Sequence, residues 1–193
     1  MASAQHTSTL GNMKKIVIAV LILCAGPALA ADSCEAQIPP SLKAALGKAF
    51  PKFRPPLATD NLAEDMEWDL KEGRKGCLGV ATSDFDGDGT KDFLLGLTAL
   101  KGSGALIVVA LARGENWKLE TLNEWPEGRI RLYVAADKPG VYRRTKALDG
   151  PLELGEIDPL TCSHSAAIFG ATESSGVAYC YNNRIWQHVW ISD

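Results

Sequence analysis

Short apolar runs separated by turn residues fill the chain from Cys77 to its C-terminal end. Segment 105–113 (ALIVVALAR) is a continuous apolar run of the kind found in central strands, and 129–135 (RIRLYVA) alternates apolar and polar residues with a period of two. Turn residues such as the Asn182-Asn183 pair separate such runs, and this pair suits a tight turn with positive φ. Further strands are expected at 77–85, 93–100, 117–125, 151–157, 165–172, 176–181 and 185–192.

The segment before Cys77 differs from the rest in its pattern of apolar residues, which at one place has the spacing of a helix. Residues 41–50 (SLKAALGKAF) place their apolar side chains on one helical face, with Ser41 as the expected N-cap and Pro51 as the end. Residues 51–61 contain three prolines and are predicted to have no regular secondary structure. Segment 62–73 fits either a short helix or a loop. The predicted fold class is therefore α+β, with a helical part at 41–76 followed by a mostly antiparallel β-sheet at 77–193.

The N-terminal segment reads as an export signal. Lys14 and Lys15 precede the apolar run 16–23, and a small-residue Ala28-x-Ala30 site follows, so cleavage is expected after Ala30. The polar residues 1–12 form a leader before this signal. The run is too short for a membrane anchor, and the lipidation that Cys24 could indicate is disfavoured by Leu23. We expect a periplasmic or secreted domain at 31–193 with no membrane anchor.

Composition and cysteine count agree with export. The chain of 193 residues is 46% hydrophobic and 22% charged, as in ordinary globular proteins, and its net charge of −3 gives no electrostatic argument for nucleic acid. Beyond Cys24, four cysteines remain, and an even number in an exported protein indicates two disulfides. We favour Cys162–Cys180, within one strand-rich unit, and therefore Cys34–Cys77. The alternative of a zinc site lacks closely spaced cysteine pairs.

The segment 84–92, DFDGDGTKD, carries the clearest chemistry in the chain. Counted from Asp84, carboxylates occupy positions 1, 3, 5 and 9, and a glycine that permits a sharp bend occupies position 6. Alternating side chains and a backbone carbonyl at position 7 can surround one calcium ion, whose charge also relieves the repulsion between the carboxylates. The predicted ligands are Asp84, Asp86, Asp88, Thr90 and Asp92. Position 12 is Leu95 rather than the glutamate of a helix-flanked EF-hand, so a loop between two strands is expected.

Segment 83–97, SDFDGDGTKDFLLGL, resembles the calcium loops of FG-GAP and VCBS-type repeats. The matching positions are Asp84, Phe85, Asp86, Gly87, Asp88, Gly89, Asp92 and the apolar Phe93. The resemblance implies calcium held by the four aspartates and the Thr90 carbonyl. The family builds propellers from several copies, whereas one copy occurs here, so an isolated blade-like sheet is the expected setting.

Other candidate residues give weaker signals. Ser163 and His164 are adjacent, and neighbours in a strand point to opposite faces, so they do not indicate a catalytic pair. Trp186, His188 and Trp190 recur with period two and share one strand face. This face is either a packed inner surface or an aromatic patch for a protein or glycan partner.

The sequence therefore favours an exported, calcium-binding, non-enzymatic interaction protein with a structural calcium ion and an unknown protein or glycan partner. One alternative is an inhibitor or immunity protein against a cell-wall hydrolase, based on size, export and disulfides. Another is a calcium-supported glycan hydrolase, which requires two carboxylates across a cleft away from residues 84–92.

Overall fold

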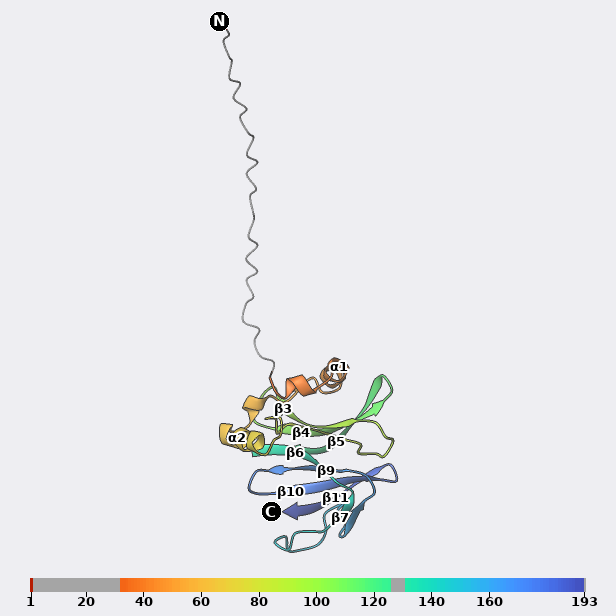
Figure 1. The fold of residues 1–193 in the computed structure, drawn as a ribbon. Coiled ribbons are helices and arrows are strands. Elements are labelled where there is room, and N and C mark those ends of the chain that lie inside the picture. The colour runs from red at the N-terminus through yellow and green to blue at the C-terminus, as the bar shows by residue number, and fades with distance from the viewer. Residues whose placement is uncertain (2–31, 126–130, 193) are drawn as a thin grey trace. The chain divides into compact units, whose positions relative to one another are not determined.

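The computed structural model describes Met1 and residues 32–125 and 131–192 (Figure 1). The predicted leader and export signal, and the cleavage site after Ala30, lie outside these residues, Met1 aside. Among the described residues, no helix is long and apolar enough to cross a bilayer. The contacts group Ala31–Asp193 as one unit, and the description below concerns that unit.

Two α-helices precede most of the strands. Helix α1 (Pro40–Ala49) buries Leu42 and Leu46, which lie one turn apart. Helix α2 (Ala63–Lys71) shows that segment 62–73, for which the sequence allowed a short helix or a loop, is mainly helical. The prediction that Ser41 caps α1 was wrong. The helix begins at Pro40, because proline suits a first turn where no amide hydrogen bond is needed. Short 3₁₀ turns occupy Glu35–Gln37 and Ala58–Asp60.

The first sheet contains the strands that flank the acidic loop. Its strands are β1 (Phe53–Arg54), β2 (Val80–Ser83), β3 (Asp92–Ala99), β4 (Ala105–Arg113) and β5 (Asn116–Trp125). All pairings are antiparallel, in the order β1-β3-β4-β5, and β2 also pairs with β3. The apolar run 105–113 is β4, which is buried along most of its length, as expected of a central strand.

The second sheet follows β5 in the chain. It is antiparallel, in the order β11-β10-β9-β6, with β6 (Leu132–Asp137), β9 (Ala166–Ala171), β10 (Gly176–Asn182) and β11 (Ile185–Ser192). The short strands β7 (Gly140–Tyr142) and β8 (Leu160–Cys162) pair with each other. The strand expected at 151–157 is absent: this segment forms turns, with one isolated bridge from Glu156 to His188.

The two larger sheets share one apolar core. Inward-facing side chains of β4, such as Ile107 and Val109, belong to the same buried cluster as Phe169 of β9 and Val177 of β10. Helix α1 covers the other face of the first sheet, where Leu42 and Leu46 join a second cluster. The fold is thus mostly antiparallel β with two α-helices, as predicted in outline, but the expected single blade-like sheet is replaced by stacked sheets (Figure 1).

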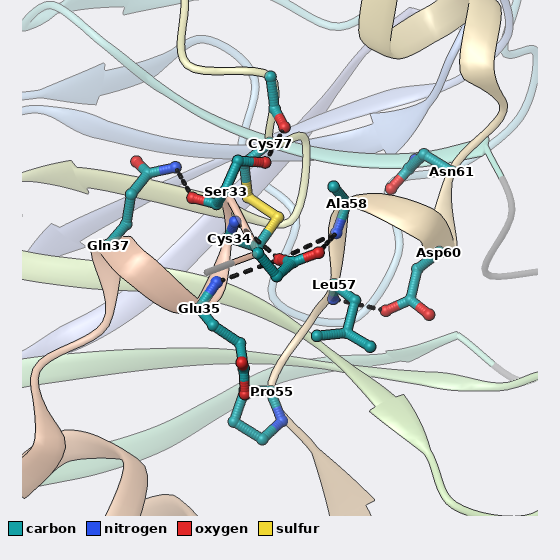
Figure 2. The surroundings of a disulfide bond; sticks show 12 residues. Ser33, Cys34, Glu35, Gln37, Pro55, Leu57, Ala58, Asp60, Asn61 and Cys77 are labelled. Atoms are coloured by element: carbon teal, nitrogen blue, oxygen red, sulfur yellow. Dashed lines mark hydrogen bonds between the residues drawn. A yellow bond between two sulfur atoms is a disulfide. The ribbon is translucent and has the colours of Figure 1, made fainter. Parts of the chain in front are cut away.

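Among the described residues, two disulfides join the four cysteines in the pairing that the sequence favours. Cys34 pairs with Cys77 and Cys162 with Cys180, each with a Cα–Cα distance of 5.1 Å. Figure 2 shows the first of them, which ties the N-terminal segment to the chain just before β2. Beside it, the Asp32 carboxylate accepts hydrogen bonds from the backbone N–H groups of Cys34, Glu35 and Ala58.

The turn between β10 and β11 lies one residue later than predicted. Asn183 (φ 52°) and Arg184 (φ 66°) have positive φ, whereas Asn182 ends β10. The Asn182 side-chain amide donates to the Thr161 carbonyl at 2.8 Å and to Gln187 Oε1 at 3.1 Å. Asn182 pairs with Ile185 across the two strands, so the two-residue loop with positive φ consists of Asn183 and Arg184.

Candidate metal site

The acidic loop connects two paired strands, as the sequence predicts. Strands β2 and β3 are antiparallel, and Ser83 lies opposite Asp92 at the base of the loop. Phe85, the second loop residue, is fully buried in the core between the sheets. The loop is therefore fixed at its base by strand pairing and at its second residue by core packing.

Three aspartates converge inside this loop. Asp84, Asp86 and Asp88 each offer a carboxylate oxygen, and these oxygens lie within 4.8 Å of one another. The Asp84 carboxylate accepts hydrogen bonds from the N–H groups of Gly87 at 2.7 Å and Gly89 at 3.0 Å. Both glycines have positive φ (78° and 83°), which lets the chain turn back around the carboxylates. Spacing and backbone together thus gather three negative charges around one point.

Asp92, which the sequence predicts as a fourth carboxylate ligand, is not one of the three converging aspartates. Its side chain is fully buried, and its oxygens accept hydrogen bonds from the N–H groups of Phe85 at 2.9 Å and Ala112 at 2.8 Å. Burial raises the pKa of Asp92 to about 6; the two hydrogen bonds oppose this shift, and nearby Asp86 and Asp88 add to it. Asp92 therefore joins the loop to β4. Thr90 turns its N–H (2.8 Å) and its hydroxyl toward Asp88 Oδ1.

Arg113, which the sequence reasoning missed, reaches the aspartates from the end of β4. Its guanidinium donates to Asp86 Oδ2 and, at 3.0 Å, to Asp88 Oδ2. The hydrogen bond to Asp86 raises the pKa of Arg113, as do the charges of the loop aspartates. A signal was present in the sequence: in an antiparallel β3–β4 pair, the end of the second strand meets the start of the first, beside the loop.

A polar hollow of about 490 Å³ adjoins the loop. It is lined by Asp86, Ser163, His164, Tyr181, Asn182, Asn183, Arg184 and Gln187. A Cβ at Gly87 would overlap the His164 ring, and the positive φ of 78° independently favours glycine at this position. Ser163 Oγ donates a hydrogen bond to Asn182 Oδ1 at 3.3 Å.

The aromatic face of β11 packs toward the core. Trp186 and Trp190 are partly buried against the cluster between the sheets, and their indole N–H groups donate to Glu120 (2.7 Å) and Glu153 (3.2 Å). The His188 ring stacks on Tyr179 with centroids 5.2 Å apart, and burial lowers the pKa of His188. These contacts favour a packed inner face; use of the three residues for partner binding stays a prediction.

Comparison of the chain with family models, curated proteins and solved structures finds no match. The likeness to FG-GAP and VCBS-type repeats therefore rests on the residues of segment 83–97 alone.

Proposed function

We propose that this chain is an exported, non-enzymatic interaction protein that binds one structural calcium ion in the loop between β2 and β3. The observation that carries the proposal is the convergence of the Asp84, Asp86 and Asp88 oxygens within 4.8 Å. Carboxylates brought so close repel one another, and the single guanidinium of Arg113 leaves two of their three negative charges uncompensated. The two disulfides support an oxidising compartment such as the periplasm, where calcium is available.

The arrangement favours calcium over magnesium and a structural over a switching role. Calcium accepts many oxygen ligands in flexible geometry, which suits three carboxylates and the Thr90 carbonyl, whereas magnesium requires near-octahedral geometry. Leu95, at the position of the closing EF-hand glutamate, is fully buried within β3. The strands on both sides belong to the core sheet, so the ion would reinforce a sheet connection rather than move a helix.

Arg113 acts as an internal counter-cation that calcium must displace. We expect Arg113→Gln to raise calcium affinity several-fold, because Asp86 and Asp88 then bind the ion without first losing an ion pair. The same variant should be less stable than the wild type in chelator, since the aspartates lose their only cation among the described contacts. Calorimetry and thermal unfolding measure the two effects. Arg74→Gln, which breaks a pair outside the loop, is the control. Unchanged or weaker calcium binding by Arg113→Gln would contradict this role.

Calcium affinity should fall as the pH is lowered through about 6. The pKa of Asp92 is raised to about 6 from its ordinary 3.8, and a nearby divalent ion favours the ionised carboxylate. Binding therefore releases a proton below that pH and none well above it. Without calcium, the stability of the folded protein changes in the opposite direction. The folded state holds the Asp92 proton more tightly than the unfolded state does, so the free energy of unfolding decreases as the pH rises from 3.8 to about 6. Calorimetric titrations across this range test both statements, and a pH-independent affinity would refute them.

Thermal unfolding of an isosteric variant tests the proposed function. With saturating calcium, the wild-type midpoint should rise relative to its value in chelator, because the ion binds the folded state. Asp86→Asn keeps the size of the side chain but removes its charge, and should lose most of this rise. Asp149→Asn, which neutralises an exposed aspartate elsewhere, is the matched control. A calcium-dependent rise of equal size in Asp86→Asn would remove the loop from the proposal.

A further inference from the structure

Helix α2 buries its two aspartates and exposes two of its large apolar side chains. Asp65 and Asp69 are 7% and 2% exposed, whereas Trp68 and Leu70 are 53% and 58% exposed. A helix that packs on a protein core normally shows the opposite pattern, so both the buried carboxylates and the exposed apolar groups need a specific reason.

The burial of Asp69 is explained by partners within the protein. Its carboxylate pairs with Arg74 Nε at 2.5 Å and accepts the N–H of Gly76 at 2.9 Å. The Arg74 guanidinium in turn lies 4.4 Å from the centre of the Trp68 ring. Asp69 thus organises the turn that follows α2 and leads to Cys77.

Asp65, one helical turn earlier, has no equivalent partner. Its Oδ2 atom is buried and makes no hydrogen bond. Removing a carboxylate oxygen from water without a compensating donor is unfavourable, so natural proteins rarely keep such a group without a use for it. A bound ligand with a donor group would supply the missing hydrogen bond.

Asp65 lines a cleft of about 1220 Å³ between α2 and the strands β2 and β6. Apolar residues of this cleft include Leu78, Val80, Ala81, Val134 and Ala135, and the exposed Trp68 stands at its side. The cleft is thus large enough for a small molecule or an extended side chain, with apolar walls along which a hydrocarbon stem can lie.

The charges of the cleft favour a cationic ligand at Asp65. Arg74 is paired with Asp69, and Arg131 is paired with Glu173 at 3.1 Å, while Glu64 and Lys75 are exposed and opposite in sign. The buried charge without a partner is therefore negative. Arg131 Nε is also buried without a hydrogen-bond partner, but the guanidinium to which it belongs is held at its Nη2 atom by Glu173.

We propose that this cleft binds an ammonium or guanidinium group carried on an apolar stem. The charged group pairs with Asp65, and the stem lies along Trp68 and the apolar residues of β2 and β6. Such chemistry is found in free alkylamines and in the lysine or arginine side chains of a partner. The site is separate from the acidic loop and does not depend on calcium.

Titration of isotope-labelled protein, purified after expression of the full chain, tests this proposal by NMR. The probes are pentylamine, Nα-acetyl-lysine methylamide and its uncharged counterpart Nα-acetyl-norleucine methylamide. The two amines should shift amide signals of α2 and β6 in a saturable manner, and the norleucine probe should not. Stronger binding of the lysine probe indicates a partner side chain as the source, and stronger binding of pentylamine indicates a free amine.

Variants on the same helix make the test specific. Asp65→Asn should weaken amine binding by about 10-fold or more, the effect expected for a lost hydrogen bond to a charged group. Glu67→Gln, which neutralises an exposed acid of α2 outside the cleft, should leave binding unchanged. The proposal would be overturned if the norleucine probe bound as strongly as the lysine probe, or if Asp65→Asn bound the amines as strongly as the wild type. The absence of saturable shifts at millimolar probe would also overturn it.

Stability without ligand gives an independent readout. Because Asp65 Oδ2 has no internal hydrogen bond, Asp65→Asn should unfold at the same temperature as the wild type or a higher one. A clear decrease in the melting temperature would make Asp65 a structural group and contradict a binding role.

Discussion

Replacing Phe85 with alanine should lower the free energy of unfolding by about 3–5 kcal/mol, the range for large-to-small changes at buried aromatic residues. Phe85 is fully buried in the cluster shared by the two larger sheets, although it belongs to the acidic loop. The substitution removes its packing and leaves a cavity beside Ile107 and the other members of that cluster. Equilibrium urea unfolding with and without calcium measures the change.

The same substitution should also weaken calcium binding. The Phe85 N–H is held by Asp92, and its neighbours Asp84 and Asp86 supply two of the converging carboxylates. A loop that is no longer fixed in the core must be ordered when the ion binds, and this lowers the affinity. Phe85→Leu, which keeps most of the apolar volume, should lose far less stability and far less calcium affinity than Phe85→Ala. A destabilisation below about 1 kcal/mol for Phe85→Ala would be incompatible with a core role for this side chain.

Removal of the Cys34–Cys77 disulfide should be the second large perturbation. The bridge closes a loop of 43 residues, and restricting the unfolded chain by a loop of this length stabilises the folded state by about 4 kcal/mol. The Cys162–Cys180 bridge closes only 18 residues, which corresponds to about 3 kcal/mol. Double serine variants of each pair, compared by urea unfolding, test this order.

The surroundings of the first disulfide add to this difference. Asp32 holds the Cys34, Glu35 and Ala58 backbones together, and Ser33 Oγ donates to the Gly76 carbonyl beside Cys77 (Figure 2). Without the bridge, these contacts have to hold the N-terminal segment alone. If loss of Cys162–Cys180 proved the more damaging, the attachment of that segment would contribute less than its contacts indicate.

Long apolar runs made much of the sheet structure predictable. β4 coincides with the run 105–113, because a central strand requires apolar side chains on both faces. β1, β7 and β8 were missed, since two or three residues are too few to show a period. The prediction of a strand at 151–157 was wrong, because this segment forms turns. Its Glu156 pairs with Arg144 in the folded protein.

The candidate site was predictable where it is local in sequence. The spacing of Asp84, Asp86 and Asp88 and the two glycines determine the loop, so their convergence followed from the sequence. The role of Asp92 and the contact from Arg113 depend on how β3 pairs with β4, which spacing alone does not give. Helix α2 was left undecided because its buried positions are acidic, which disguises the usual apolar stripe.

Calorimetric titration of calcium into chelator-treated protein tests the central claim most directly. We predict saturable binding of one ion per chain in the wild type, weaker binding of magnesium, and loss of the calcium signal in Asp86→Asn. Absence of calcium binding in the wild type, or binding of the same strength in Asp86→Asn, would contradict the assignment of this loop as a calcium site.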